Sequence, residues 1–207
     1  MSGKFIVFEG CEGVGKSTQL RLLKDYLTES GQPAVFTREP GGTPVAEAVR
    51  NLILDKSYEI SPVVEAYLFA TARADHVRQV IMPALRRGEL VVCDRFLSSS
   101  YAYQGYARGL GFEMIKQINA AALEDCKPDC TIFIDMDPAI SWRKQNGKTI
   151  TDDRIENESV EFHGKVYEGY KRLAEADPTF VSVAPLPEKS ATHRLILEAL
   201  KKRGLIR

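Results

Sequence analysis

Residues 10–18 read GCEGVGKST and match the template of a phosphate-binding loop, G-x-x-x-x-G-K-[ST]. The segment before it, 4–8 (KFIVF), is short and apolar, as a buried parallel strand is. After it, Leu20, Leu23 and Leu27 have helical spacing. The motif therefore lies at a strand-to-helix turn, the setting that the template requires. A chance glycine-rich turn is the alternative, and it requires no such setting.

This loop has the chemistry to bind a nucleoside triphosphate. Its glycines let backbone N–H groups surround phosphate oxygens, and the start of the helix adds partial positive charge. The Lys16 ammonium can reach the β and γ phosphates, and the Ser17 hydroxyl can ligate Mg²⁺. We therefore expect the triphosphate to be bound by Gly10, Cys11, Glu12, Gly13, Val14, Gly15, Lys16, Ser17 and Thr18.

The composition argues against a broad charged surface. In 207 residues, 28 Lys and Arg balance 28 Asp and Glu, so we expect neither nucleic acid nor a membrane as a partner. The sequence contains no apolar run of about 20 residues, and the first strand begins too early for a signal peptide. We expect a soluble, cytoplasmic protein. The four cysteines lack the paired spacing of a zinc site and are expected to be reduced thiols: Cys11, Cys93, Cys126 and Cys130.

Strand-like and helix-like segments alternate along the chain. The further strand candidates are 34–37, 90–94, 131–135 and 179–183. The helix candidates are 19–27, 43–54, 62–87 with a bend at Pro83, 114–124, 138–144, 156–174 and 189–202. This alternation predicts a parallel sheet covered by helices on both faces, an α/β fold of the P-loop NTPase type. Ligands then bind at the carboxyl ends of the strands.

The segment 37–43 (TREPGGT) follows the second predicted strand. Its Pro-Gly-Gly alone indicates an ordinary turn, in which Thr43 caps the next helix. Arg38 favours a further function, because a guanidinium at a strand end can pair with a phosphate. Arg38 is therefore a candidate ligand for a second phosphate.

Asp94 and Arg95 end the third predicted strand. An aspartate at this place is where a P-loop enzyme holds Mg²⁺, directly or through water, and the adjacent arginine can bind a phosphate with two donors. The alternative is a buried structural ion pair. Residues 98–104 (SSSYAYQ) follow, and their hydroxyls, rings and amide suit recognition of a base and a sugar.

Residues 142–156 contain several cations and little apolar surface. The segment is either a solvated basic loop or a mobile lid that closes over polyphosphate. The phosphate-binding loop favours a lid, because phosphoryl transfer needs cations around the transferred group and the exclusion of water.

Phe69 and Arg73 are four residues apart in a predicted helix and therefore share a face. A phenylalanine at helical spacing usually belongs to the core, but here an arginine shares that face. The pair suggests stacking and hydrogen bonding against a flat base.

Several stretches, in one order along nearly the whole chain, resemble thymidylate kinases: FEGCEGVGKST, TREPGGTPVAEAVR, LFATARADHV, IMPALRRGELVVCDRF, SSSYAYQGYARG and DRIE. The resemblance implies a five-stranded parallel sheet with ATP at the phosphate-binding loop and dTMP in the facing cleft. It also implies a homodimer whose chain is a single nucleoside monophosphate kinase domain over residues 1–207, with a lid at about 142–156.

The resemblance assigns roles in binding the base and the sugar. It places Phe69 against thymine and Arg73, Ser100 and Gln104 at the polar edge of the base. Tyr103 is expected under the sugar, where it disfavours a ribose 2′-hydroxyl.

The resemblance also assigns roles around the phosphates. Glu12 is expected near the 3′-hydroxyl, and the monophosphate is expected to be held by Arg38, Arg50 and Arg95. Because Gly13 replaces the arginine that some members carry in the loop, the chain is similar to the bacterial type, which supplies a catalytic arginine from the lid.

We expect transfer of the γ-phosphoryl group of ATP to dTMP, giving ADP and dTDP, a step in dTTP synthesis. The expected catalytic residues are Lys16, Asp94, Arg95, Arg143 and Arg154, and the expected Mg²⁺ ligands are Ser17 and Asp94. The lid also contains Lys144 and Lys148, so either kind of cation could touch the phosphoryl group; we expect an arginine, since its planar fork spans two oxygens. Two rivals stay open, a kinase for another nucleotide or a deoxynucleoside, and a nucleotide-controlled binding switch.

Overall fold

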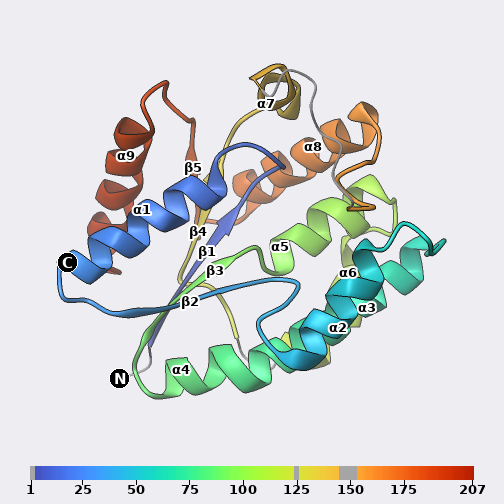
Figure 1. The fold of residues 1–207 in the computed structure, drawn as a ribbon, viewed down its shortest axis with the longest axis horizontal. Coiled ribbons are helices and arrows are strands. Elements are labelled where there is room, and N and C mark those ends of the chain that lie inside the picture. The colour runs from blue at the N-terminus through green and yellow to red at the C-terminus, as the bar shows by residue number, and fades with distance from the viewer. Residues whose placement is uncertain (1–2, 124–125, 145–152) are drawn as a thin grey trace.

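The computed structural model describes residues 3–123, 126–144 and 153–207. Within this part of the chain, a five-stranded parallel sheet has the order β2-β3-β1-β4-β5. Its strands are β1 (Lys4–Glu9), β2 (Ala34–Arg38), β3 (Leu90–Asp94), β4 (Cys130–Ile134) and β5 (Phe180–Val183). Strand β1 is central, between β3 and β4 (Figure 1). The sheet confirms the predicted α/β fold.

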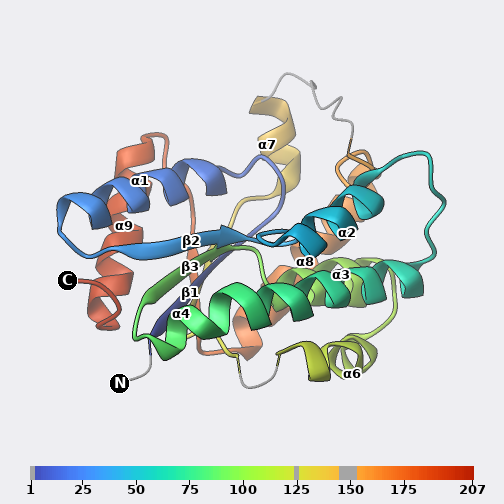
Figure 2. The ribbon, with the colours of Figure 1, turned by 60° about the horizontal axis from the view of Figure 1, so that its bottom comes forward.

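Helices cover both faces of this sheet (Figure 2). They are α1 (Lys16–Glu29), α2 (Pro44–Leu54), α3 (Pro62–His76), η1 (Val77–Ile81), α4 (Met82–Arg86), α5 (Leu97–Ser100), η2 (Tyr101–Ala107), α6 (Phe112–Leu123), α7 (Pro138–Lys144), α8 (Val160–Ala176) and α9 (Lys189–Lys202). The segments η1 and η2 are π-helical. The first of them precedes Pro83, which lacks an N–H and cannot continue the regular hydrogen-bond pattern.

The helix over 97–107 was not predicted from the sequence. Its serines, tyrosines and Gly105 have low helix propensity, so its stability must come from packing. Gly169 of α8 shows why that packing is close, because a Cβ added there would lie 3.1 Å from the Ala102 Cα. The start of α8 also differs from the predicted 156. Ser159 caps the helix by accepting a hydrogen bond from the Phe162 amide at 3.1 Å.

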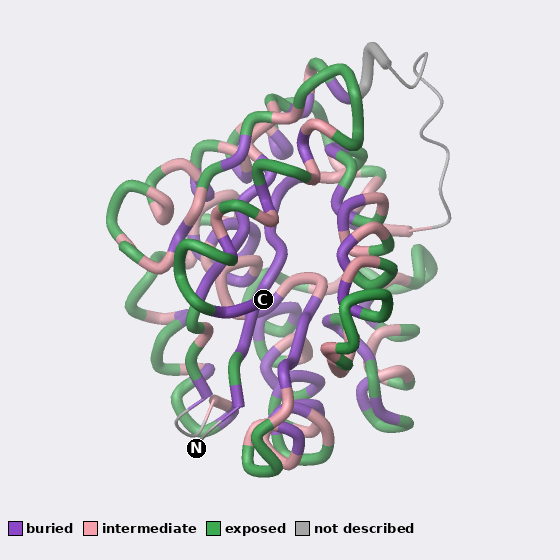
Figure 3. The backbone as a smooth tube through the Cα atoms, turned by 90° about the vertical axis from the view of Figure 1, so that its left-hand side faces the viewer, coloured by how far each residue is buried: buried purple, intermediate pink, exposed green. Residues whose placement is uncertain are grey.

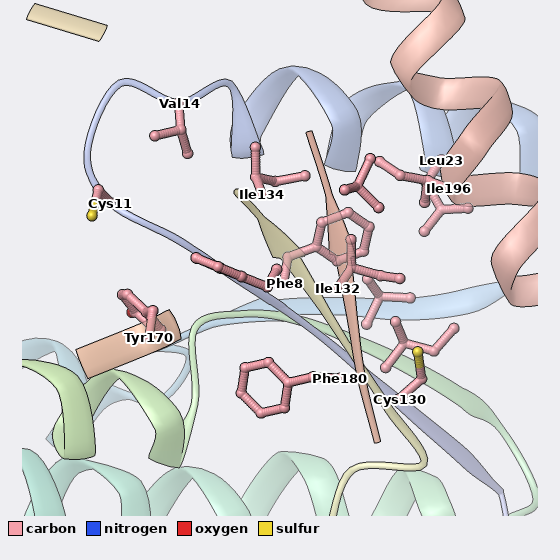
Figure 4. Close-up of a cluster of buried hydrophobic side chains, with 14 of the residues drawn as sticks. Phe8, Cys11, Val14, Leu23, Cys130, Ile132, Ile134, Tyr170, Phe180 and Ile196 are labelled. Atoms are coloured by element: carbon pink, nitrogen blue, oxygen red, sulfur yellow. The ribbon is translucent and has the colours of Figure 1, made fainter. Parts of the chain in front are cut away.

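The core lies on both faces of the sheet, because successive residues of a strand point to opposite sides. Ile6 and Phe8 belong to a buried cluster with Leu23 of α1 and Ile196 of α9. Figure 4 shows Leu23 and Ile196 together beside the sheet. Helices α1 and α9 therefore cover this face.

The opposite face carries the other residues of β1. Phe5 and Val7 pack with Val77 and Ile81 of η1 in a second buried cluster. The three central strands, β1, β3 and β4, are almost entirely buried, and Figure 3 shows buried residues in purple at the centre of the molecule with green mostly around them. Of the helices that the structure describes, none has the length and apolar character needed to cross a membrane.

Candidate active site

The phosphate-binding loop connects β1 to α1 at the carboxyl end of the sheet (Figure 1). Gly10, Gly13 and Gly15 have φ values of 140°, 70° and 101°, which favour glycine. At Gly10 the space is also restricted, since a Cβ would lie 2.9 Å from the Ile134 carbonyl oxygen. The side chains of Cys11 and Val14 belong to the buried core, and their packing holds the loop in position (Figure 4).

Lys16 is the first residue of α1, and its side chain folds back over this loop. Its Nζ donates to the carbonyl oxygens of Gly10 at 2.9 Å and Cys11 at 2.7 Å. Burial and then the nearby Arg95 guanidinium lower the pKa of Lys16. The ammonium is thus held in place where the loop's phosphates are expected.

A pocket of about 400 Å³ opens beside the loop. Most of the predicted site residues line it: Glu12, Gly13, Gly15, Lys16, Ser17, Thr18, Arg38, Arg50, Phe69, Asp94, Arg95, Tyr103 and Gln104. Seven further lining residues had no individual role assigned from the sequence, although all except Leu54 lie in segments that the sequence indicated: Glu39, Pro40, Leu54, Ser99, Asp153, Ile155 and Glu156. The pocket volume suits small-molecule ligands.

Arg95 is at the centre of the polar contacts in this pocket. Its backbone has a φ of 68°, a conformation that is uncommon for a residue other than glycine, and its amide donates to the Phe8 carbonyl at 2.9 Å. Its guanidinium pairs with Glu12 and lies 5.3 Å from the centre of the Tyr103 ring. The strained backbone turns this side chain into the pocket, between the loop and η2.

Glu12 is ionised in this arrangement. Burial opposes its ionisation, but Arg95 and then Lys16 outweigh that effect and lower the pKa of Glu12 to about 2. Burial likewise disfavours the charged form of Arg95, yet Glu12 keeps the Arg95 pKa well above its usual value. The two side chains therefore form a permanent ion pair on the pocket wall at neutral pH.

A second carboxylate, Glu9, lies under Arg95. It is buried at the end of β1 and accepts hydrogen bonds from the amides of Phe96 and Ser99 at 3.0 and 3.1 Å. The hydroxyls of Ser99 and Tyr170 also donate to Glu9, at 2.7 and 2.8 Å. These contacts fix the turn that carries Arg95. The only sequence signal for them was an acidic residue at the end of an apolar strand.

Asp94 and Ser17 meet the requirements for Mg²⁺. Both line the pocket, and Asp94 Oδ1 is buried without a hydrogen-bond partner among the described residues. A buried carboxylate oxygen without a partner is costly, and a cation would satisfy it. The described residues contain no cluster of three or more His, Cys, Asp or Glu side chains suited to a metal. Mg²⁺ is usually held by one or two protein ligands together with phosphates and water, and Asp94 and Ser17 are two such ligands.

The other two arginines expected at the monophosphate, Arg38 and Arg50, also line the pocket. Arg38 makes a two-pronged pair with Glu47, at 2.8 and 3.1 Å. Arg50 donates to the Pro40 carbonyl at 3.1 Å. Both side chains are thereby held at the pocket, with further donors available for an anion.

Some of the residues expected at the base line the pocket and others do not. Phe69 and Gln104 line the pocket, whereas Ser100 and Arg73 do not. Arg73 is 2% exposed and donates hydrogen bonds to Glu39 at 2.8 Å and to Asn119 at 2.6 Å. It also donates to Ser100 at 3.1 Å. Arg73 therefore contacts the pocket lining through Glu39 and is itself buried outside that lining.

The predicted lid is described in part. The side chain of Arg143 and residues 145–152 lie outside the described part of the chain. Arg154 is described, and it does not line the main pocket, although its neighbours Asp153 and Ile155 do. Its Nη2 donates instead to Glu65 at 2.7 Å.

Comparisons with known proteins show the family of this chain. A family model described as thymidylate kinase matches residues 8–196. The chain belongs to the thymidylate kinase family. The thymidylate kinase of Caldanaerobacter subterraneus subsp. tengcongensis is 45% identical over 203 residues, which cover 98% of this chain and 97% of that protein. That of Symbiobacterium thermophilum is 46% identical over 205 residues, covering 96% and 95% of the two chains.

A solved structure supports the same family. The crystal structure of thymidylate kinase from Ehrlichia chaffeensis has a TM-score of 0.77 and 32% sequence identity to this chain, and the match covers 97% of this chain and 99% of that one. These findings confirm the resemblance inferred from the sequence and the class of enzyme, a phosphotransferase.

Proposed function

We propose that this protein transfers the γ-phosphoryl group of ATP to dTMP, giving ADP and dTDP for dTTP synthesis. One observation carries the proposal. A single pocket brings the phosphate-loop residues Lys16 and Ser17 together with an aromatic ring, Phe69, and an amide, Gln104. The triphosphate of ATP on the loop and the base of dTMP against Phe69 would then share one cavity. The phosphate of dTMP would face the γ-phosphate of ATP.

The chain's own residues position and neutralise the phosphates. A dTMP phosphate oxygen is already a nucleophile, so the enzyme needs no covalent intermediate, and orientation can supply much of the rate enhancement. Lys16 would stabilise charge on the β and γ oxygens, and Arg95, fixed by its pairing with Glu12, would hold the acceptor phosphate. Arg143 is our candidate for the lid cation.

Ser17 and Asp94 would hold Mg²⁺. Mg²⁺ held there would supply positive charge that offsets the charge of the phosphates. Asp94 Oδ1 needs a partner and can accept this role without losing another contact among the described residues.

We also propose that 1–207 is one nucleoside monophosphate kinase domain with its lid at about 142–156, and that it forms a homodimer in the cytoplasm. Val63, Val64 and Tyr67 are exposed at 37%, 50% and 55% on α3, which supports a self-association face there. The buried thiols of Cys11, Cys93 and Cys130 form no disulfide, which supports a reducing compartment.

The test is an acceptor panel. Purified enzyme receives ATP, Mg²⁺ and one of dTMP, dUMP, UMP, dCMP or AMP, and chromatography identifies the diphosphate formed. We expect the highest kcat/KM for dTMP, about tenfold above dUMP, because a pocket discriminates a single methyl group by about that factor. A higher kcat/KM for another acceptor, or ATP hydrolysis without any acceptor, would overturn the proposal.

A further inference from the structure

Glu65 is a buried carboxylate that the reaction does not use. It lies in the first turn of α3 and is 1% exposed. Its Oε1 accepts from Gln104 Nε2 at 2.8 Å and Arg108 Nε at 3.2 Å. Its Oε2 accepts from Arg108 Nη2 at 3.1 Å and Arg154 Nη2 at 2.7 Å. Four donors from two distant segments therefore converge on one side chain.

The Glu65 carboxylate stays ionised in this setting. Burial opposes its ionisation, but Arg108, then Gln104 and Arg154, outweigh that effect and lower the pKa of Glu65. Arg108 in turn pairs with Glu158 at 2.6 Å. Two guanidinium groups and two carboxylates thus balance each other, which is the condition for a stable buried charge cluster.

Arg154 also binds the carboxyl end of α2. Its amide donates to the Leu54 carbonyl at 3.0 Å, and its Nε donates to the Ile53 carbonyl at 3.0 Å. The last carbonyls of a helix have no partner within the helix, and an arginine there also complements the helix dipole. Arg154 therefore joins the ends of two helices, α2 through these carbonyls and α3 through Glu65.

The position of Arg154 determines the pocket wall beside it. Asp153, Ile155 and Glu156 line the pocket. Asp153 Oδ1 accepts from the amides of Ile155 and Glu156 at 2.8 and 3.2 Å, so the four residues form one tight turn. We call residues 153–156 the anchor turn. Arg154 is its attachment point to α2 and α3.

We propose that Arg154 and Glu65 are positioning residues for the acceptor pocket. Together they fasten the anchor turn, and through Gln104 the same Glu65 carboxylate fixes the pocket wall where the base is expected. Arg154 then acts by holding the pocket in shape, and it is not the cation that touches the transferred phosphoryl group. The effect on dTMP rests on the proposed function, whereas the attachment of the anchor turn does not.

The experiment compares Arg154→Met, Glu65→Gln, their double variant and the control Arg203→Ala. Arg203 is a matched control, because its Nη2 also donates to backbone carbonyls, those of Pro178 and Phe180 at 3.0 and 3.4 Å, and it does not line the main pocket. Each protein is measured for its dTMP dissociation constant by calorimetry, its kcat at saturating ATP and dTMP, and amide hydrogen exchange.

We expect Arg154→Met to weaken dTMP binding by about tenfold while kcat at saturation stays within about threefold of the parent, the pattern of a lost binding geometry. The double variant should bind dTMP about as weakly as the weaker single variant, because both changes break one linkage. The amides of residues 153–158, which include the anchor turn, should lose protection from hydrogen exchange in both single variants. Arg203→Ala should match the parent in dTMP binding and in exchange at 153–158.

Three results would overturn the proposal. One is a fall in kcat of about a hundredfold in Arg154→Met with unchanged dTMP affinity, as a phosphoryl contact predicts. The second is a double variant whose loss of dTMP affinity is the product of the two single losses, as for independent sites. The third is an Arg203→Ala variant that binds dTMP as weakly as Arg154→Met does. If Glu65→Gln does not fold, the result for Arg154→Met decides the proposal alone. That variant should fold, because Arg108 still pairs with the Glu65 carboxylate. If the parent neither binds nor phosphorylates dTMP, the proposed function fails, and hydrogen exchange still tests the anchor turn.

Discussion

The Tyr170 hydroxyl accepts a hydrogen bond of 3.0 Å from Arg95 Nη1. The same hydroxyl donates to the buried Glu9 carboxylate at 2.8 Å, so a tyrosine on α8 connects the end of β1 to the side chain that we propose as the acceptor-phosphate ligand. The Tyr170 ring also stacks on Phe133 of β4, with a centroid distance of 5.4 Å. Ring and hydroxyl therefore have separable functions, packing and orientation.

Removing only the hydroxyl tests the orientation. Tyr170→Phe keeps the stacked ring, leaves Arg95 with one acceptor fewer, and should lower kcat/KM for dTMP about tenfold, the scale of a lost hydrogen bond to a charged group. Steady-state kinetics measures the effect. Tyr167→Phe is the control. Tyr167 is on the same helix, α8, but does not line the pocket, and its hydroxyl donates to Asp135 at 2.7 Å. Equal kinetics in both variants would remove Tyr170 from the site.

Tyr103 is expected to select the sugar. Its ring is 6% exposed and lines the pocket, and Arg95 lies above it. A ring close to C2′ crowds an added hydroxyl and leaves it without a partner. Tyr103→Ala should therefore reduce the ratio of kcat/KM for dTMP to that for its ribose counterpart. Tyr106 is a half-buried residue of the same helix that does not line the pocket, so Tyr106→Ala should leave that ratio unchanged. An unchanged ratio in Tyr103→Ala as well would contradict the assignment.

Asp94 is expected to hold Mg²⁺. Asp94→Asn removes a negative charge from the metal site, so the Mg²⁺ concentration for half-maximal activity should rise by about tenfold or more, the scale of one lost ion contact. Titration of activity with Mg²⁺ measures it. Asp135→Asn is the control, because that carboxylate also follows a strand but is paired with Lys171 at 3.0 Å. The same Mg²⁺ requirement in Asp94→Asn and the parent would place the metal elsewhere.

The Glu12–Arg95 pair predicts a pH dependence of stability. Glu12 has a pKa of about 2 in the folded state, below its ordinary value, so its ionised form stabilises the fold. This contribution is complete above the pKa of the unfolded state, about 4.5, and is lost as the pH falls from there towards 2. Glu12→Gln should be less stable than the parent at pH 6.

Urea unfolding at pH 6, 4 and 3 checks this. The difference in free energy of unfolding between parent and Glu12→Gln should shrink as the pH falls from 6 to 3, because Glu12 becomes protonated in the unfolded parent, which stabilises the unfolded state relative to the folded one. A constant difference would show that Glu12 does not carry the acid dependence.

Local sequence patterns predicted the sheet and the loop because their signals lie within a few residues. Each strand is a short apolar run, and the loop has its glycines and lysine at fixed spacing. The helix over 97–107 escaped prediction because its support comes from elsewhere in the chain. Gly169 is distant in sequence, and only the fold shows that its missing side chain makes room for Ala102.

Side-chain partners were the least predictable part of the site. Helical spacing correctly placed Phe69 and Arg73 in one helix, but it did not show that Arg73 would be buried in a pair with Glu39, outside the pocket lining. Arg154 had the composition of a lid cation, and its partner Glu65 is 89 residues away. Such pairings depend on which elements meet, and a single sequence gives no direct signal for that.

The central claim is that the phosphate-binding loop of this pocket transfers a phosphoryl group from ATP to dTMP. The most direct measurement is the rate of dTDP formation from ATP and dTMP, by chromatography, in the parent and in Lys16→Ala, with circular dichroism to verify the fold. We predict dTDP from the parent and a loss in kcat of about a hundredfold or more in the variant, the scale of one deleted transition-state contact. A correctly folded Lys16→Ala enzyme that forms dTDP at the parent's rate would contradict the account.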